Sequence, residues 1–66
     1  MKFFVQQSGN ENILIGGVRS LLDFTSTEVT LSTKKGTIRV LGDDLQIVYF
    51  NSDEICLKGR ISGYEC

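Results

Sequence analysis

Apolar and polar residues alternate along the middle of the chain with a period of two, which is typical of β-strands rather than helices. The alternation runs through EVTLST, TIRVL and LQIVYF, at residues 28–33, 37–41 and 45–50. β-Branched and aromatic residues dominate these segments, as strands prefer. KFFVQQ at 2–7 and ILIGGVRSLLDF at 13–24 predict further strands before them.

The pattern predicts an all-β fold, a small antiparallel β-sandwich or barrel built from a meander of about six or seven strands. Residues 1–66 are expected to form a single domain, because no linker or low-complexity segment interrupts them. Val18, Leu21 and Leu22 also have the spacing of a short helix. The segment is short, glycine precedes it and β-formers follow, so we predict a strand there.

The first hairpin can be predicted from parity. Opposed residues of an antiparallel pair point to the same face, so a slip of one residue would turn the apolar set to water. For Val29 and Leu31 to share a face with Ile38 and Val40, the turn must have an even length. The simplest choice is Lys35-Gly36, with glycine supplying the positive φ.

The same parity predicts a second hairpin, in which Val40 pairs with Ile47 across a turn at Asp43-Asp44. Aspartate tolerates the left-handed conformation that such a turn requires. The two hairpins together predict one inner face, made of Val29, Leu31, Ile38, Val40, Leu45 and Ile47.

The opposite face of these strands is unusually apolar, because Leu41, Val48 and Phe50 lie on it. A strand that is apolar on both sides is either central in a sandwich or covered by another subunit. A chain of 66 residues builds only a small core and usually needs a staple or a partner. We therefore predict a homo-oligomer, with a dimer favoured, and these three residues as its interface candidates.

The last segment, residues 54–66, is long for one strand. Ile55, Leu57 and Ile61 share a parity, and Gly59 falls in the same series. Glycine inside a strand often marks a bulge, a bend or a close backbone approach. We predict that the strand bends at Gly59 from one sheet to the other.

The polar residues of this segment do not predict a reactive site. Asp53 and Glu54 are adjacent, so on a strand they would point to opposite faces, and we interpret them as part of a polar turn. Lys58 and Arg60 are expected to protect an exposed strand edge. The chain has no histidine, so the base that a nucleophile needs would have to come from another residue type. No enzyme activity and no cofactor are expected.

The two cysteines, Cys56 and Cys66, lack the CxxC spacing of a zinc site. We expect Cys56 to be a small buried hydrophobe with little reactivity and Cys66 to lie at a frayed end, in a reducing compartment. No apolar stretch approaches the roughly 20 residues of a membrane span, and the N-terminus has no export signal. A cytoplasmic protein is expected, which meets a membrane only through a partner.

A nucleic-acid alternative rests on VTLSTKKGTIRVLGDDLQ, which resembles the first motif of Sm-like RNA-binding proteins. That resemblance implies a ring-forming protein that binds RNA through Lys34, Lys35 and Arg39. Against it, the formal net charge is −1, and no aromatic residue stands among the basic ones to stack on a base. Nucleic acid is therefore not the expected partner.

Most of the chain, from about Gly9 to Glu65, resembles the YabP/YqfC family of sporulation proteins. The resemblance is carried by Phe24 to Glu28, by Leu31, Thr33 and Gly36, by Ile38 and Gly42, by Leu45 and Ile47, and by Ile55, Leu57, Gly59 and Ile61. The connection FNSDEI is closer to the YqfC branch. Gly36, Gly42 and Gly59 are then expected to be structural glycines.

The resemblance implies a small β-sandwich protein made in the cytoplasm of endospore-forming bacteria during sporulation. It implies no catalytic residue and no cofactor. YqfC-type proteins are similar to companions of a membrane-anchored sporulation protein, so a partner of that kind is expected. Many relatives carry an N-terminal extension, which we expect this sequence to lack because it starts close to its first strand.

Overall fold

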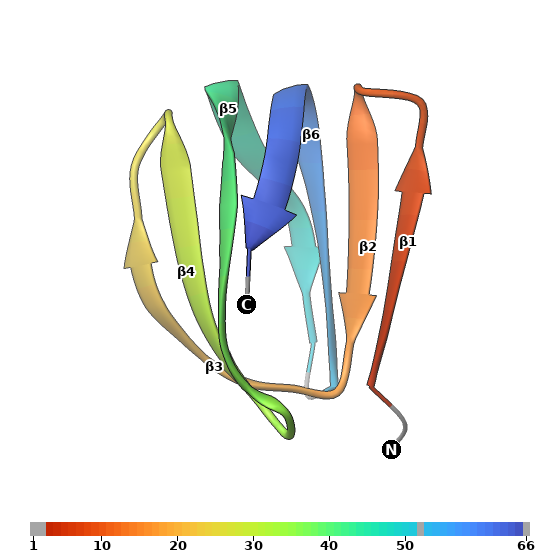
Figure 1. Cartoon of the computed structure of the whole chain (residues 1–66), viewed down its shortest axis with the longest axis vertical. Helices are drawn as coiled ribbons and strands as arrows, with labels where there is room; N and C mark the ends of the chain where they lie inside the picture. The colour runs from red at the N-terminus through yellow and green to blue at the C-terminus, as the bar shows by residue number, and fades with distance from the viewer. Residues whose placement is uncertain (1–2, 52, 66) are drawn as a thin grey trace.

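The computed structural model describes residues 3–51 and 53–65. Its six strands are β1 (Phe4–Ser8), β2 (Asn12–Gly16), β3 (Val18–Phe24), β4 (Glu28–Thr33), β5 (Gly36–Phe50) and β6 (Glu54–Glu65). All pairs are antiparallel, and the strands form one open sheet in the order β1-β2-β6-β5-β4-β3 (Figure 1). The predicted all-β antiparallel fold is confirmed, and residues 18–24 are a strand rather than a helix.

The strand order departs from a simple meander between β2 and β3. β3, β4, β5 and β6 are consecutive neighbours, but β2 pairs with β6 instead of β3. Gly17, with a φ of +78°, lets the chain leave β2 and start β3 at the other edge of the sheet. The Val18 N–H donates to the Asp53 carbonyl over 3.0 Å, and the Lys34 N–H donates to the Gly17 carbonyl over 3.1 Å. These bonds fix the connection from β2 to the edge strand β3.

The first hairpin has the predicted faces but a different turn. Val29 pairs with Val40, and Leu31 pairs with Ile38, as parity requires. The register also pairs Thr33 with Gly36, so the two turn residues are 34 and 35, not 35 and 36.

The side chain of Thr33 explains this shift of one residue. Its hydroxyl donates to the Gly36 carbonyl over 2.7 Å and accepts the Lys35 N–H over 3.1 Å, which closes the turn around the two lysines. Gly36 still has a positive φ, +117°, but it is the first residue of β5.

The predicted hairpin at Asp43-Asp44 is wrong, because β5 runs through it without reversing. Asp44 does adopt the left-handed conformation, with a φ of +53°, but it forms a bulge. The pairing of β5 with β6 skips there, from Asp43–Arg60 to Gln46–Lys58. Consequently Val40 and Ile47 do not pair with each other; they pair with Tyr64 and Leu57 of β6.

The bulge in β5 lies against Gly59 of β6, where the strand was predicted to bend from one sheet to the other; β6 instead remains within the single sheet on both sides of Gly59. Gly59 has a φ of +135°, and a Cβ there would lie 2.5 Å from the Asp44 carbonyl oxygen. A Cβ at Gly42 would likewise collide with the Arg60 carbonyl oxygen. The two strands thus turn together at a corner where their backbones touch, so that the sheet folds over one core (Figure 1).

The core is aliphatic and draws on every strand except β1 for its buried residues. Five of the six predicted inner-face residues are buried, and the sixth, Ile47, is half-buried and packs against them. The buried hydrophobic residues are Ile13, Ile15, Val18, Val29, Leu31, Ile38, Val40, Leu45, Ile55, Leu57 and Ile61.

On the outer face, Arg39 links three strands through its guanidinium group. Its Nε lies 3.3 Å from Oε2 of Glu28, and its Nη1 lies 3.5 Å from Oε1 of Glu65. All three side chains are solvent-exposed to a large extent, and exposed ion pairs contribute about 0–1 kcal/mol because water and salt screen them.

We therefore expect Arg39→Ala to lower the free energy of unfolding by less than about 1 kcal/mol. Urea denaturation followed by circular dichroism at low and high salt would measure this. A loss of several kcal/mol that is independent of salt would contradict this account of the pair.

Candidate interaction surface

The large hydrophobic side chains that remain exposed are concentrated on two strands. Among the described residues they are Leu22 and Phe24 of β3, Val48, Tyr49 and Phe50 of β5, and Tyr64 of β6. Monomeric proteins rarely leave such side chains clustered in water, and clusters of this kind mark interaction sites. We call the cluster on β3 and β5, namely Leu22, Phe24, Val48, Tyr49 and Phe50, the β3/β5 face.

Hydrogen bonds at both ends bring β3 and the second half of β5 to one side of the molecule. The β2–β3 junction is joined to Asp53, just beyond β5, by the bond from Val18. At the other end the Leu45 N–H donates to the Ser26 carbonyl over 2.8 Å. β3 is an edge of the sheet, and β5 pairs with β4 only up to Leu41, so each segment has one unpaired side.

A second bulge in β5 changes the predicted placement of Val48 and Phe50. The register skips between Ile47 and Tyr49, so that Tyr49 pairs with Cys56 and Phe50 pairs with Ile55. Paired residues point to the same side, so Phe50 leans toward the side of buried Ile55, whereas Val48 lies within the bulge and pairs with no residue of β6. Both remain accessible, with Val48 51% and Phe50 41% exposed.

Leu41, the third interface candidate, lies elsewhere. It is half-buried on the outer face, where it pairs with Glu28 on one side and Gly63 on the other. The structure therefore brings Val48 and Phe50 together on the β3/β5 face and leaves Leu41 beside the ion pairs of Arg39.

Sequence reasoning missed the contribution of β3. Leu22 falls at a register shift between Leu21 and Asp23, which turns it outward, and it is 56% exposed. Phe24 pairs with buried Val29, but it lies at the end of an edge strand. The described residues cover it only in part, and it is 42% exposed. The adjacent leucines in LLDF were the available signal, since one of two neighbours on a strand must point away from the core.

Tyr49 adds a polar group to the face. Its hydroxyl donates to Oε1 of Glu54 over 3.5 Å, from β5 to the neighbouring strand β6. Desolvation raises the pKa of Tyr49 above its usual value of 10.0, and the negative charges of Glu54 and Cys56 and the hydrogen bond to Glu54 raise it further. The phenol therefore stays protonated at neutral pH and remains a hydrogen-bond donor.

Asp53 and Glu54 lie in the polar turn that was predicted between β5 and β6. Oδ1 of Asn51 accepts the N–H groups of Asp53 and Glu54 over 3.1 and 3.0 Å, which confirms the predicted polar turn. Lys58 does not protect an edge, because it pairs with Asn12 on one side and with Gln46 on the other.

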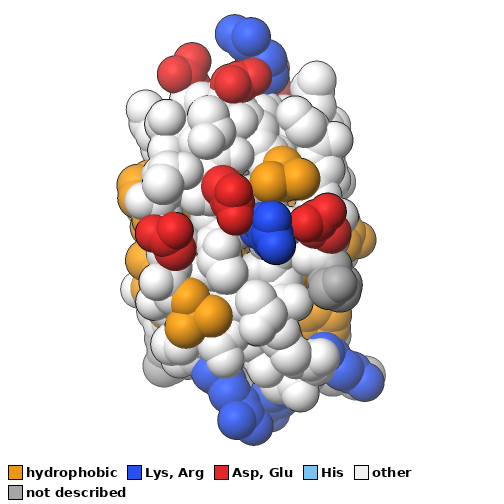
Figure 2. Space-filling view, turned by 60° about the vertical axis from the view of Figure 1, so that its left-hand side comes forward, with side chains coloured by type: hydrophobic (Ala, Val, Ile, Leu, Met, Phe, Trp, Pro, Cys, Tyr) orange, Lys and Arg blue, Asp and Glu red, His pale blue; other side chains and the backbone are white. Residues whose placement is uncertain are grey.

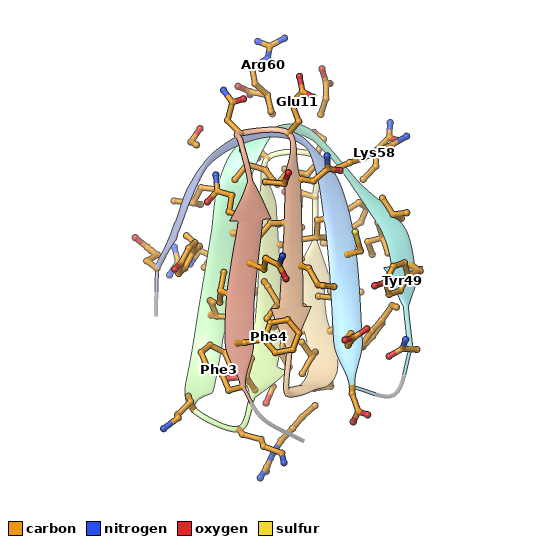
Figure 3. All side chains as sticks on the ribbon, turned by 90° about the vertical axis from the view of Figure 1, so that its right-hand side faces the viewer. Phe3, Phe4, Glu11, Tyr49, Lys58 and Arg60 are labelled. Carbon is orange, nitrogen blue, oxygen red and sulfur yellow. The ribbon has the colours of Figure 1, made fainter. Side chains whose placement is uncertain are left out.

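Both Lys58 and Arg60 line a shallow cleft at the end of the molecule where β1 and β2 turn (Figure 3). The cleft has a volume of about 630 Å³, and its other lining residues are Asn10, Glu11, Asn12, Asp44 and Gly59. Because two acidic side chains stand among the two basic ones, the cleft has no dominant charge with which to select an ion.

Cys56 is not the buried hydrophobe that was expected. It is half-buried and pairs with Leu14 and Tyr49, on the side opposite its buried neighbours Ile55 and Leu57. Cys66 lies outside the described residues. Across residues 3–51 and 53–65, no group of His, Cys, Asp or Glu side chains is arranged to hold a metal ion.

The basic residues of the RNA alternative do not form a continuous surface. Lys34 and Lys35 are exposed in the β4–β5 turn, whereas Arg39 lies between two carboxylates. On the face that Figure 2 shows, lysine and arginine side chains gather mainly at the two ends of the molecule, with acidic side chains across the middle. A nucleic-acid backbone needs clustered positive charge, so this arrangement does not support the alternative.

Within the described part of the chain, nothing helical has the length and apolarity that spanning a membrane requires. A comparison with curated proteins gave no match. The model of the YabP family matches residues 5–65, which extend from β1 to the end of β6. This family is a sporulation protein family and is not a known enzyme family. The chain therefore belongs to the YabP family.

Proposed function

We propose that this protein is a non-catalytic structural module in bacterial endospore formation, which acts by binding a second copy of itself and a partner protein. The observation that carries the proposal is the β3/β5 face, where large apolar side chains of two strands are about half exposed to solvent. Membership of the YabP family is consistent with a role in sporulation.

Self-association is favoured by the size of the core. A core this small contributes roughly 3–5 kcal/mol to the stability of the fold. Burying the exposed apolar surface against a second copy would therefore add a large fraction of that stability. Homo-oligomers of soluble proteins most often have twofold symmetry, in which the same patch meets itself. The β3/β5 face suits this arrangement, because it is mostly apolar and carries two aromatic rings from β5 that can pack against their copies.

Val48→Asp is the sharpest test, because Val48 is exposed and can be changed without opening the core. A carboxylate buried in an apolar interface has no partner, so we expect the dissociation constant to rise at least about tenfold, which corresponds to about 1.4 kcal/mol. Sedimentation velocity over a micromolar concentration series measures it. Phe50→Asp should also dissociate the protein, but it would disturb the side of Ile55 as well.

The matched control is Thr37→Asp, which places the same charge at an exposed position of the first half of β5, away from the β3/β5 face. It should leave the association unchanged, as should Asp43→Ala at the exposed bulge. Equal effects of Val48→Asp and Thr37→Asp would show that net charge, and not the β3/β5 face, governs association.

For the partner, we propose a membrane-anchored sporulation protein that recruits this chain from the cytoplasm. The support is the FNSDEI connection, which resembles the YqfC branch of the family, whose members are similar to companions of such proteins. A pull-down from sporulating cells with the unmodified chain and with Val48→Asp tests it. Recovery of the same membrane protein by both baits would place the partner site outside the β3/β5 face, and recovery of no membrane protein by either bait would refute the partner.

A further inference from the structure

Strand β1 differs from the other exposed strand edges in having no protection. It forms one edge of the sheet, and its sequence FVQQS contains no charged residue and no proline. Its pairing with β2 is continuous from Phe4–Gly16 to Ser8–Asn12, without a bulge. Charges, prolines and bulges are the features by which proteins keep an open edge from pairing with another strand.

The edge formed by β3 shows these features clearly. Its pairing with β4 shifts twice, between Val18 and Ser20 and between Leu21 and Asp23. It also carries a charged side chain near each end, Arg19 and Asp23. The end of β6, which lies beyond the reach of β2, carries Arg60 and Glu65. The second half of β5, which is unpaired on one side beyond Leu41, contains two register shifts, at Asp43/Gln46 and at Ile47/Tyr49. Among the edges that the structure describes, β1 is therefore the one that is both regular and uncharged.

We propose that β1 pairs with β1 of a second copy, antiparallel and about a twofold axis, so that two sheets join into one. This inference rests on the proposed function, since it specifies a second route of self-association.

Parity restricts the register of the proposed pair. Val5 and Gln7 pair with buried Ile15 and Ile13, so the odd-numbered residues of β1 point to the inner side and the even-numbered ones to the outer side. Opposed residues must share a side, so their numbers must add to an even total. Among such registers, only the one centred on Gln6 pairs all five residues of the strand with their copies.

The side chains suit this register. Gln6 meets its own copy at the twofold axis, and an amide carries both donors and an acceptor, so two identical amides can bond to each other. Val5 meets Gln7 and Phe4 meets Ser8 of the other copy, and no like charges face each other. Phe4 is held over Gly16, where an added Cβ would collide with its ring, so the strand is fixed in place before it pairs.

β1 and β3 are the two opposite edges of the sheet order, and they lie on opposite sides of the molecule in Figure 1. Pairing through β1 therefore leaves the β3/β5 face free. A protein with two separate twofold contacts assembles beyond a dimer, into a closed ring or a filament, which is what a scaffold requires.

The test places opposite charges at Gln6, the residue that meets its own copy at the proposed twofold axis. In the Val48→Asp background, where the β3/β5 contact is removed, we expect a dimer that Gln6→Lys and Gln6→Glu each abolish, because like charges then face each other. Mixing these two variants in equal amounts should restore the dimer, since lysine then faces glutamate. Sedimentation velocity at micromolar to submillimolar concentration reads each state, and far-UV circular dichroism confirms that each variant is folded.

The outcomes separate the two contacts. A Val48→Asp protein that is monomeric at all concentrations, or a mixture that does not reassociate, would overturn the pairing through β1. A Val48→Asp protein that assembles as far as the unmodified chain would refute the β3/β5 contact, and the charge exchange would then be read in the unmodified background. Amide hydrogen exchange needs no substitution: the N–H groups on the free side of β1 should exchange more slowly as concentration rises, and unchanged rates would also overturn the pairing.

Discussion

Replacing Gly59 with alanine is expected to unfold a large part of the protein at room temperature. A left-handed residue with a side chain costs about 1–2 kcal/mol, and Gly59 has a φ of +135°. In addition, the new Cβ would lie 2.5 Å from the oxygen and 2.9 Å from the carbon of the Asp44 carbonyl. These are backbone atoms of the β5 bulge, so they cannot move aside without separating the two strands. Strain and collision together should cost about 3 kcal/mol or more, which is comparable with the whole stability of a small domain.

Two other glycines separate these causes. Gly36 has a positive φ but nothing within 4 Å of an added Cβ, so Gly36→Ala measures the backbone strain alone. Gly63 has neither feature, so Gly63→Ala should be close to neutral. Urea denaturation of the three variants, at a concentration where the protein is dissociated, gives the free energies of unfolding. If Gly59→Ala destabilises no more than Gly36→Ala, the backbones do not touch at the corner as described.

Leu57→Ala is expected to have the second large effect on stability, a loss of about 2–5 kcal/mol. Leu57 is 0% exposed and lies in the middle of the sheet, between Ile13 of β2 and Ile47 of β5. Truncation removes apolar contacts and leaves a cavity that these paired strands cannot close by moving together. Much of the variant should be unfolded without denaturant, and its thermal unfolding midpoint should fall steeply.

The control for Leu57 is Leu22→Ala, which removes the same atoms from a side chain that is 56% exposed. It should change the free energy of unfolding by no more than about 0.5 kcal/mol when the protein is dissociated. A large loss for Leu22→Ala under these conditions would mean that Leu22 packs inside the monomer and does not belong to an interaction surface.

The parts of the fold that were predictable are those controlled by neighbouring residues. The period of two placed Val29, Leu31, Ile38 and Val40 on the core side, because a strand cannot present its side chains in any other order. The turn was misplaced by one residue, since the hydroxyl of Thr33, and not glycine, selects it.

The errors in β5 have a common physical cause. An aspartate in the left-handed conformation can occur in a hairpin turn and in a β-bulge. The alternation of apolar and polar residues in the sequence is the same in both cases. Whether the chain reverses or bulges at Asp44 depends on Gly59, which is distant in the sequence. Because Gly59 has no side chain, β6 can lie against the bulge. The second bulge, near Val48, likewise depends on the partner strand, and it moved Phe50 to the side of Ile55.

The candidate surface was predictable only in part for the same reason. Whether an apolar side chain is covered depends on which strands are edges, and the pairing of β2 with β6 decides that. The sequence pattern predicted Val48 and Phe50 of β5 as interface candidates, and both are exposed, but it could not associate them with Leu22 and Phe24 on the edge strand β3.

The central claim is that a single copy leaves apolar surface exposed, which association with further copies then covers. Sedimentation velocity of the unmodified chain over a concentration series tests this claim directly, because it measures association. The account predicts a sedimentation coefficient that rises with concentration, through dimers toward larger species. A well-folded monomer at every concentration, up to the submillimolar range, would contradict it.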